Sequence, residues 1–142
     1  MVLLKTRGAV AFLVAGLHLL AGCSRGPKKD EDFTPPPDKA KQALEAALNH
    51  WQAGHPPKDV PGGPPAVWVV DSVWKSGQQL KAFEILGEDN PAAGSGSAPR
   101  YFRVRLTPAK GQPQEVRYVV VGIDPLWVYR EKDFDSLSGT GK

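Results

Sequence analysis

A single helix-periodic segment, residues 38–53, most constrains what this chain can fold into. Its apolar residues recur at the spacing that places them on one side of an α-helix. They are Ala40, Ala43, Leu44, Ala47, Leu48 and Trp51. Asp38 suits the first turn, and Gly54 followed by Pro56 and Pro57 ends the segment. Because half of this face is alanine, we expect a β-sheet to pack closely against it.

The other patterned segments are typical of β-strands. We expect strands at residues 66–74, 80–88, 100–107, 115–123 and 126–130. Ser76-Gly77 indicates a hairpin between the first two, and the nearly continuous valines of 115–123 indicate a central strand. We expect Trp51, the only large aromatic residue on the helix face, to pack against residues 116–121 and close one end of the core.

One helix followed by four or five strands predicts an α+β fold, in which a single N-terminal helix packs on a curved antiparallel sheet. This element order resembles the cystatin-like or NTF2-like roll, where a sheet wraps around an N-terminal helix. The resemblance covers residues 38–134 and rests on no sequence motif. NTF2-like rolls usually carry more than one helix before their strands, so the simpler cystatin-like arrangement is favoured. A β-sandwich is the competing fold, but the strand count is low for one.

The N-terminus has the pattern of a signal peptide. Lys5 and Arg7 precede an apolar run from Ala9 to Ala21. As a helix this run would span roughly 20 Å, which is short of the ~30 Å hydrocarbon core of a bilayer. The length therefore suits a cleaved signal peptide better than a transmembrane helix.

The motif Leu20-Ala21-Gly22-Cys23 ends this run and matches the lipobox of bacterial lipoproteins. The resemblance implies a lipid thioether on Cys23, cleavage before it, and anchoring of the mature protein to the extracytoplasmic side of a membrane. Ser24, which is not Asp, favours the outer membrane in a host with two membranes. Lipidation also accounts for the single cysteine, which has no partner for an internal disulfide.

We therefore expect four parts. Residues 1–22 are a lipoprotein signal peptide, 23–37 a flexible tether rich in proline and charge, 38–135 the α+β domain, and 136–142 a flexible tail. The formal net charge is +3, and loss of the signal peptide leaves 16 basic against 15 acidic residues. A chain so nearly neutral gives no reason to expect nucleic acid as a partner.

The sequence nominates no metal, cofactor or catalytic nucleophile. His50 and His55 have no further ligand at metal-binding spacing, and no serine lies in a Gly-x-Ser-x-Gly elbow. Asp71 and Glu84 lie within apolar strands, where a buried carboxyl group could act as an acid or base. An acid in the cone does such work in NTF2-like enzymes, but pairing with strand arginines is the favoured interpretation here.

Four aromatic residues, Trp68, Trp74, Trp127 and Tyr129, either line an apolar groove or fill the core, and the core is favoured. The candidate groove or pocket residues are Trp68, Asp71, Trp74, Glu84, Arg103, Arg105, Trp127 and Tyr129.

Three functions remain open. The favoured one is a lipid-anchored, non-catalytic domain that binds an envelope protein or a small ligand. The second is an NTF2-like enzyme that uses Asp71 or Glu84 in a sheet-lined cavity. The third is a structural envelope lipoprotein that assembles through a sheet edge.

Overall fold

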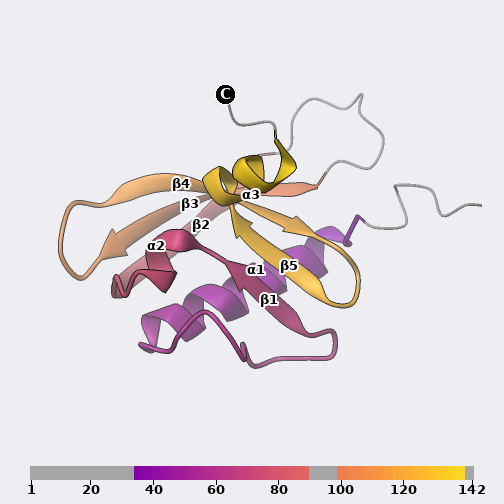
Figure 1. Cartoon of the computed structure of the whole chain (residues 1–142), viewed down its shortest axis with the longest axis horizontal. Coiled ribbons are helices and arrows are strands. Elements are labelled where there is room, and N and C mark those ends of the chain that lie inside the picture. Colours follow the sequence, from indigo (N-terminus) through magenta and orange to yellow (C-terminus); the bar gives the residue numbers. More distant parts are fainter. Residues whose placement is uncertain (1–33, 90–98, 140–142) are drawn as a thin grey trace, which may run out of the picture.

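A computed structural model describes residues 34–89 and 99–139 (Figure 1). The elements in chain order are α1 (Pro37–Gln52), β1 (Val67–Val70), α2 (Ser72–Lys75), β2 (Leu80–Glu88), β3 (Arg100–Pro108), β4 (Gln114–Val121), β5 (Leu126–Arg130) and α3 (Glu131–Ser138). The signal peptide, Cys23 and most of the expected tether lie outside the described residues, as does the loop 90–98. None of the described helices is long and apolar enough to cross a membrane.

The five strands form one mixed, open sheet in the order β1-β5-β4-β3-β2. The pairs β2–β3, β3–β4 and β4–β5 are antiparallel, whereas β1 pairs parallel with β5. The α+β class and the helix-on-sheet arrangement are therefore confirmed. The expectation of a wholly antiparallel sheet is wrong for one pair, and β1 and β2 lie at opposite edges instead of forming a hairpin.

Asp71 explains why β1 is short and why no hairpin follows it. Its carboxylate accepts hydrogen bonds from the backbone N–H groups of Val73 and Trp74, which ends β1 and starts the one-turn helix α2. The predicted strand 66–74 is therefore only four residues long. Gly77, at φ 95°, follows the end of α2. Ser76-Gly77, predicted as a hairpin turn, therefore ends helix α2 instead. The chain then crosses to the far edge of the sheet, where β2 lies.

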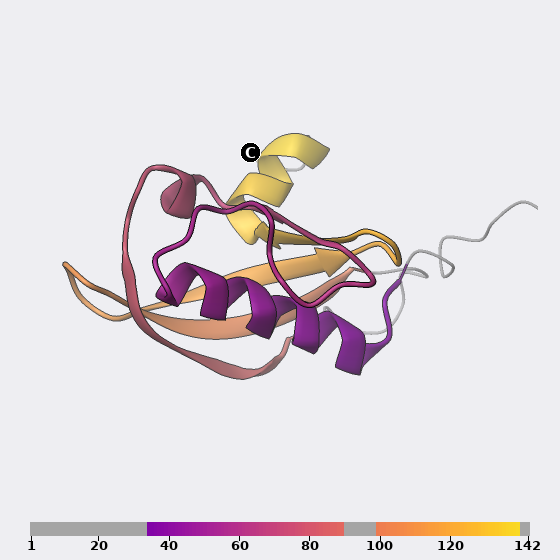
Figure 2. The ribbon, with the colours of Figure 1, turned by 90° about the horizontal axis from the view of Figure 1, so that it is seen from below.

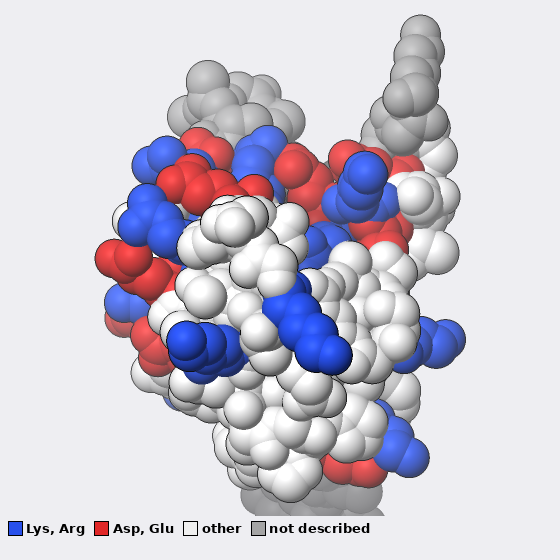
Figure 3. Space-filling model, turned by 90° about the vertical axis from the view of Figure 1, so that its left-hand side faces the viewer, with Lys and Arg blue, Asp and Glu red and all other residues white. Residues whose placement is uncertain are grey.

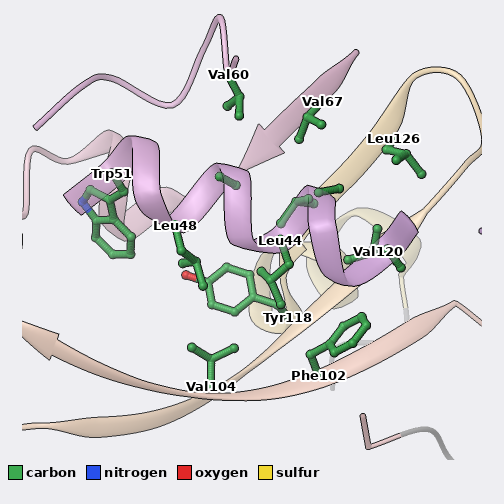
Figure 4. Close-up of a cluster of buried hydrophobic side chains, with 14 of the residues drawn as sticks. Leu44, Leu48, Trp51, Val60, Val67, Phe102, Val104, Tyr118, Val120 and Leu126 are labelled. Carbon is green, nitrogen blue, oxygen red and sulfur yellow. The ribbon is translucent and has the colours of Figure 1, made fainter. Parts of the chain in front are cut away.

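Helix α1 lies within one residue of its predicted bounds and buries the predicted face. Figure 4 shows Leu44, Leu48 and Trp51 pointing from α1 toward side chains of the central strands. Tyr118 and Val104, which those strands contribute, are almost fully buried. The short alanine side chains let the sheet approach closely, so the branched residues of helix and sheet interdigitate.

The sheet has an inner face covered by α1 and an outer face on which α3 lies, and Figure 2 shows the two helices on opposite sides. Helix α3 was not expected from the sequence. Its Phe134 contacts Tyr129 of β5 at a ring-centroid distance of 5.4 Å. The last residues of the expected tether, just before α1, pack on the domain. Pro35 is buried, and its carbonyl accepts a hydrogen bond from Arg100.

Candidate binding surfaces

Asp71 is the most buried charged residue among those predicted as site residues. Besides the two α2 amides, its carboxylate accepts a hydrogen bond from the Tyr118 hydroxyl at 2.6 Å and from Arg130 Nε at 3.0 Å. The carboxylate side chain has no exposed surface. Four donors therefore occupy its oxygens, and Asp71 joins α2, β4 and β5 into one polar network inside the core.

The network keeps Tyr118 protonated. Burial raises the pKa of Tyr118 well above its ordinary value near 10, and the nearby charge of Asp71 raises it further. A protonated hydroxyl can donate to Asp71 throughout the neutral pH range. The observed partners of Asp71 thus describe a structural role.

Glu84 lies on the outer face, where it belongs to a ladder of ion pairs. Arg105 of β3 contacts Glu84 of β2 and Glu115 of β4, each at 3.1 Å. All three side chains are about half exposed, and paired strands hold them in register. The favoured interpretation of Glu84 as a cross-strand partner is confirmed. Figure 3, which views the molecule from the left-hand side of Figure 1, shows basic and acidic side chains interleaved over the upper part of that view.

The tryptophans divide between the two faces. Trp74 is 4% exposed and stacks on Trp51 of α1 at 5.3 Å, so both belong to the core. Their indole N–H groups donate to the carbonyls of His55 and Gln78. The core interpretation therefore holds for Trp74, and the stacking partner described for Trp51 is Trp74.

An aromatic row crosses the outer face near the β1 edge. Trp68 and Trp127 are paired across β1 and β5, with ring centroids 5.2 Å apart. Trp127 is 5.9 Å from Tyr129, which in turn contacts Phe134 of α3. Trp68 keeps 55% of its surface exposed. Of the two predictions for these aromatic residues, a surface groove or the core, the surface one is nearer to the structure for this row. The rings lie on the outer face of the sheet and not in the core.

Beside the aromatic row, the outer backbone edge of β1 is only partly paired in the described part of the chain. The N–H of Leu126 donates to the carbonyl of Ala66, so Ala66 and alternate residues after it point their backbone groups toward β5. Val67 and Val69 therefore point theirs the other way. Val67 forms a bridge with Val60 there, and no described strand lies beside Val69.

A cavity of about 600 Å³ adjoins this edge. Its lining includes Val69 and Val70 of β1 and the loop residues Pro56, Pro57 and Lys58. The cavity leaves room for a further chain segment beside β1.

Arg103 points from the same outer face and lines a second cavity, near the start of α3. His50 and His55 stack on each other at 4.6 Å, and His50 hydrogen-bonds the carbonyl of Lys58. Among residues 34–89 and 99–139, no three His, Cys, Asp or Glu side chains are grouped to hold a metal ion.

Comparisons with known proteins add no family or function. No protein-family model matches the chain, no curated protein matches it, and no solved structure matches it. The resemblances to bacterial lipoproteins and to the cystatin-like or NTF2-like roll remain predictions from residues 20–23 and from element order.

Sequence reasoning missed Arg130, Tyr118 and Phe134 as parts of these surfaces. The sequence gives one indication for Arg130, which directly follows the apolar residues of the last predicted strand. An arginine in such a position often has a buried partner. For Phe134, the signal was the cap pattern of α3, with acids in its first turn and Gly139 in the left-handed conformation just past its end. Nothing in the local sequence connects Tyr118 with Asp71, which lies 47 positions away.

Proposed function

We propose that this chain is a lipid-anchored cell-envelope protein whose non-catalytic domain binds an extended segment of another envelope protein at the β1 edge. The anchor is the lipid on Cys23, on the extracytoplasmic side, and on the outer membrane where the host has two. The eleven residue-to-residue steps from Cys23 to Thr34 span at most about 38 Å of extended chain, which keeps the domain close to that membrane.

The observation that carries the proposal is the exposure of Trp68 on an edge strand. A large aromatic side chain left 55% exposed beside two further aromatic rings makes an apolar surface that binding would cover. Tryptophan and tyrosine are enriched among the residues that dominate binding energy in protein interfaces. The aromatic row therefore supplies affinity.

The open part of the β1 edge supplies the geometry of the partner. An extended segment that lies along β1 meets the free N–H and carbonyl of Val69 and enters the cavity between β1 and Pro56–Lys58. Strand addition of this kind takes affinity from backbone hydrogen bonds and specificity from neighbouring side chains. One side chain of the segment would contact Trp68.

The enzyme alternative loses its candidate acids to other roles. Asp71 has four hydrogen-bond donors and no exposed side-chain surface, while Glu84 pairs with Arg105 in the open. A general acid or base must be within reach of a substrate proton. These contacts favour the binding function over acid–base catalysis by either residue.

The anchor has its own test. Cys23→Ser should abolish metabolic lipid labelling and leave unprocessed precursor, because the substituted oxygen cannot form the thioether. Mass spectrometry of the membrane fraction measures both. Recovery of processed, membrane-bound protein from the variant would refute lipid anchoring at this position.

The binding surface is tested by site-specific photocrosslinking in intact cells. A photoreactive side chain at Trp68 should give one discrete protein adduct, with the crosslink mapped to one short segment of the partner. The same side chain at Lys81, which is exposed on β2 at the opposite edge, should give none. Equal adducts at both positions, or lipid adducts alone at position 68, would contradict the proposal.

A backbone variant separates strand addition from simple apolar contact. Val69→Pro removes an N–H that faces away from β5, and proline is tolerated on an edge strand in that orientation. It should abolish the adduct at position 68, whereas Val69→Ala, which shortens the side chain but keeps the backbone N–H, should retain it. Circular dichroism should show both variants folded. An adduct that survives Val69→Pro would exclude strand addition.

A further inference from the structure

A second cavity lies where β5 ends beside the longer strand β4. The last pair between these strands is Tyr118 with Arg130, so residues 114–117 extend past the end of β5. Helix α3 begins at this point. The space between them is a cavity of about 370 Å³, within the range typical of small-molecule sites. Its lining residues are Arg103, Glu115, Val116, Arg117, Arg130, Glu131 and Lys132.

The lining has an excess of unpaired positive charge. Of its two acids, Glu131 contacts Arg117 at 2.6 Å, and Glu115 contacts Arg105, which lies outside the cavity. Within the described part of the chain, Arg103 and Lys132 form no ion pair. Two cationic side chains at the rim are therefore available to a ligand.

Arg130 supplies the buried part of the site. Its side chain is 8% exposed and donates from Nε to Asp71. The same guanidinium has a buried Nη2 that meets no hydrogen-bond acceptor among the described residues. Leaving a buried donor of this kind unpaired costs about 1–3 kcal/mol, and more for a charged group. An acceptor in the adjoining cavity would remove that cost.

The start of α3 adds to the positive electrostatic potential of the cavity. Arg130 is the N-cap residue of this eight-residue helix and provides no side-chain acceptor for its first amides. The carboxylate of Asp133 in the first turn accepts a hydrogen bond from the backbone N–H of Ser72 in α2. The positive end of the helix dipole favours an anion that binds close to the first amides.

We propose that this cavity binds an oxyanion, the carboxylate or phosphate group of a small molecule. Arg130 lines the cavity and would turn its unpaired, buried Nη2 to the ligand, Arg103 and Lys132 offer charge from the rim, and α3 begins at the same lining. Guanidinium groups bind both kinds of oxyanion with paired N–H donors. The site is separate from the β1 edge and does not depend on the proposed lipid anchor.

The test is a titration of the full-length protein in detergent micelles, followed by ¹H–¹⁵N NMR. Inorganic phosphate and acetate are the two probes, with sodium chloride at equal ionic strength as the reference. At least one probe should give saturable shifts at the amides of residues 131–133 and at the Arg130 Nε–H. The probe that binds more tightly identifies the oxyanion.

Variants assign the response to the cavity. Arg103→Gln and Lys132→Gln should each weaken binding about tenfold, the effect of losing one charge-assisted hydrogen bond. Lys81→Gln is the control, because it removes an exposed cation from β2, at the far edge of the sheet and outside the cavity, and it should change binding less than about twofold. Shifts that chloride reproduces, titrations that do not saturate, or equal weakening by Lys81→Gln would each overturn the proposal.

Discussion

The two faces of the sheet use the same residue types in opposite ways. On the inner side, Trp51 of α1 and Trp74 of α2 stack on each other and are 2% and 4% exposed. On the outer face, the rings of Trp68 and Trp127 lie at nearly the same centroid distance but are tilted by 37°, and Trp68 stays 55% exposed. The difference lies in how each pair is enclosed. Trp51 belongs to α1 and Trp74 to α2, and both side chains lie in the core. On the outer face, Phe134 of α3 contacts Tyr129, and Trp68 stays exposed.

This contrast separates residues that hold the fold from residues that are free to bind. Inner-face side chains are surrounded by protein, so their removal leaves cavities. Outer-face side chains have solvent on one side, so their removal leaves the core intact. Stability measurements and binding measurements should therefore respond to different sets of residues.

The largest effect is expected at Trp51. Trp51→Ala should lower the free energy of unfolding by about 3–5 kcal/mol, because it removes a buried large aromatic residue from the core. Denaturant melts measure the loss. Trp51→Phe is the control, since it keeps a ring against Trp74 but loses the N–H that donates to Gln78, and it should cost less. A shift near zero for the alanine variant would mean that Trp51 is not a core residue.

How well the sequence predicts each region follows from how local its causes are. The periodicity of α1 and the valines of β4 are local patterns, and both elements form where predicted. β1 is shorter than predicted because Asp71 ends the strand by capping α2, and its parallel pairing with β5 joins segments far apart in the chain. Residues 66–74 are rich in Val and Trp, so propensity favours a longer strand there, and tertiary contacts override it.

The candidate site was harder to predict for the same reason. Apolar strand residues alternate between faces, but the sequence does not say which face a helix will cover. Trp68 and Trp74 were therefore equivalent in the sequence, although one is exposed and the other buried. The Asp71 network joins residues far apart in the chain, and its buried carboxylate could equally have indicated an acid–base residue.

A smaller effect is expected within the buried network. Tyr118→Phe should cost about 1–3 kcal/mol at neutral pH, because the Asp71 carboxylate loses one of its donors. The pKa of Tyr118 is raised in the folded protein, so its contribution is present below about pH 10, the unfolded value, and is lost as pH rises toward the folded pKa. The stability difference between wild type and variant should therefore shrink above pH 10.

Tyr129→Phe is the control for that pH profile. Tyr129 lies on the outer face, where partial burial also raises its pKa, but without a charged partner. Its substitution should change neutral-pH stability little. Urea melts of the three proteins from pH 7 to 11 provide the comparison. A constant difference between wild type and Tyr118→Phe across that range would mean that the hydroxyl is not held protonated by burial.

Trp68→Ala should affect binding much more than stability. The variant loses an aromatic contact with Trp127, which is worth about 1 kcal/mol, but opens no cavity in the core. Denaturant melts should therefore show a loss well below that of Trp51→Ala. For the binding measurement, the photoreactive group is placed at position 127, beside residue 68. The adduct that it forms next to Trp68 should be lost in the Trp68→Ala variant. A loss of 3 kcal/mol or more in the free energy of unfolding would mean that Trp68 is a core residue like Trp51, and the contrast between the two faces would not hold.

The smallest effect is expected at Arg105, in the charged part of the outer face. Arg105→Gln removes two ion pairs, with Glu84 and Glu115, but all three side chains are about half exposed. Exposed pairs of this kind contribute about 0–1 kcal/mol, and salt screens them. The stability difference from wild type should thus be about 0.5 kcal/mol at low salt and fall toward zero near 1 M sodium chloride. A difference that persists at high salt would mean that packing of the arginine stem against the sheet, and not its charge, holds the ladder together.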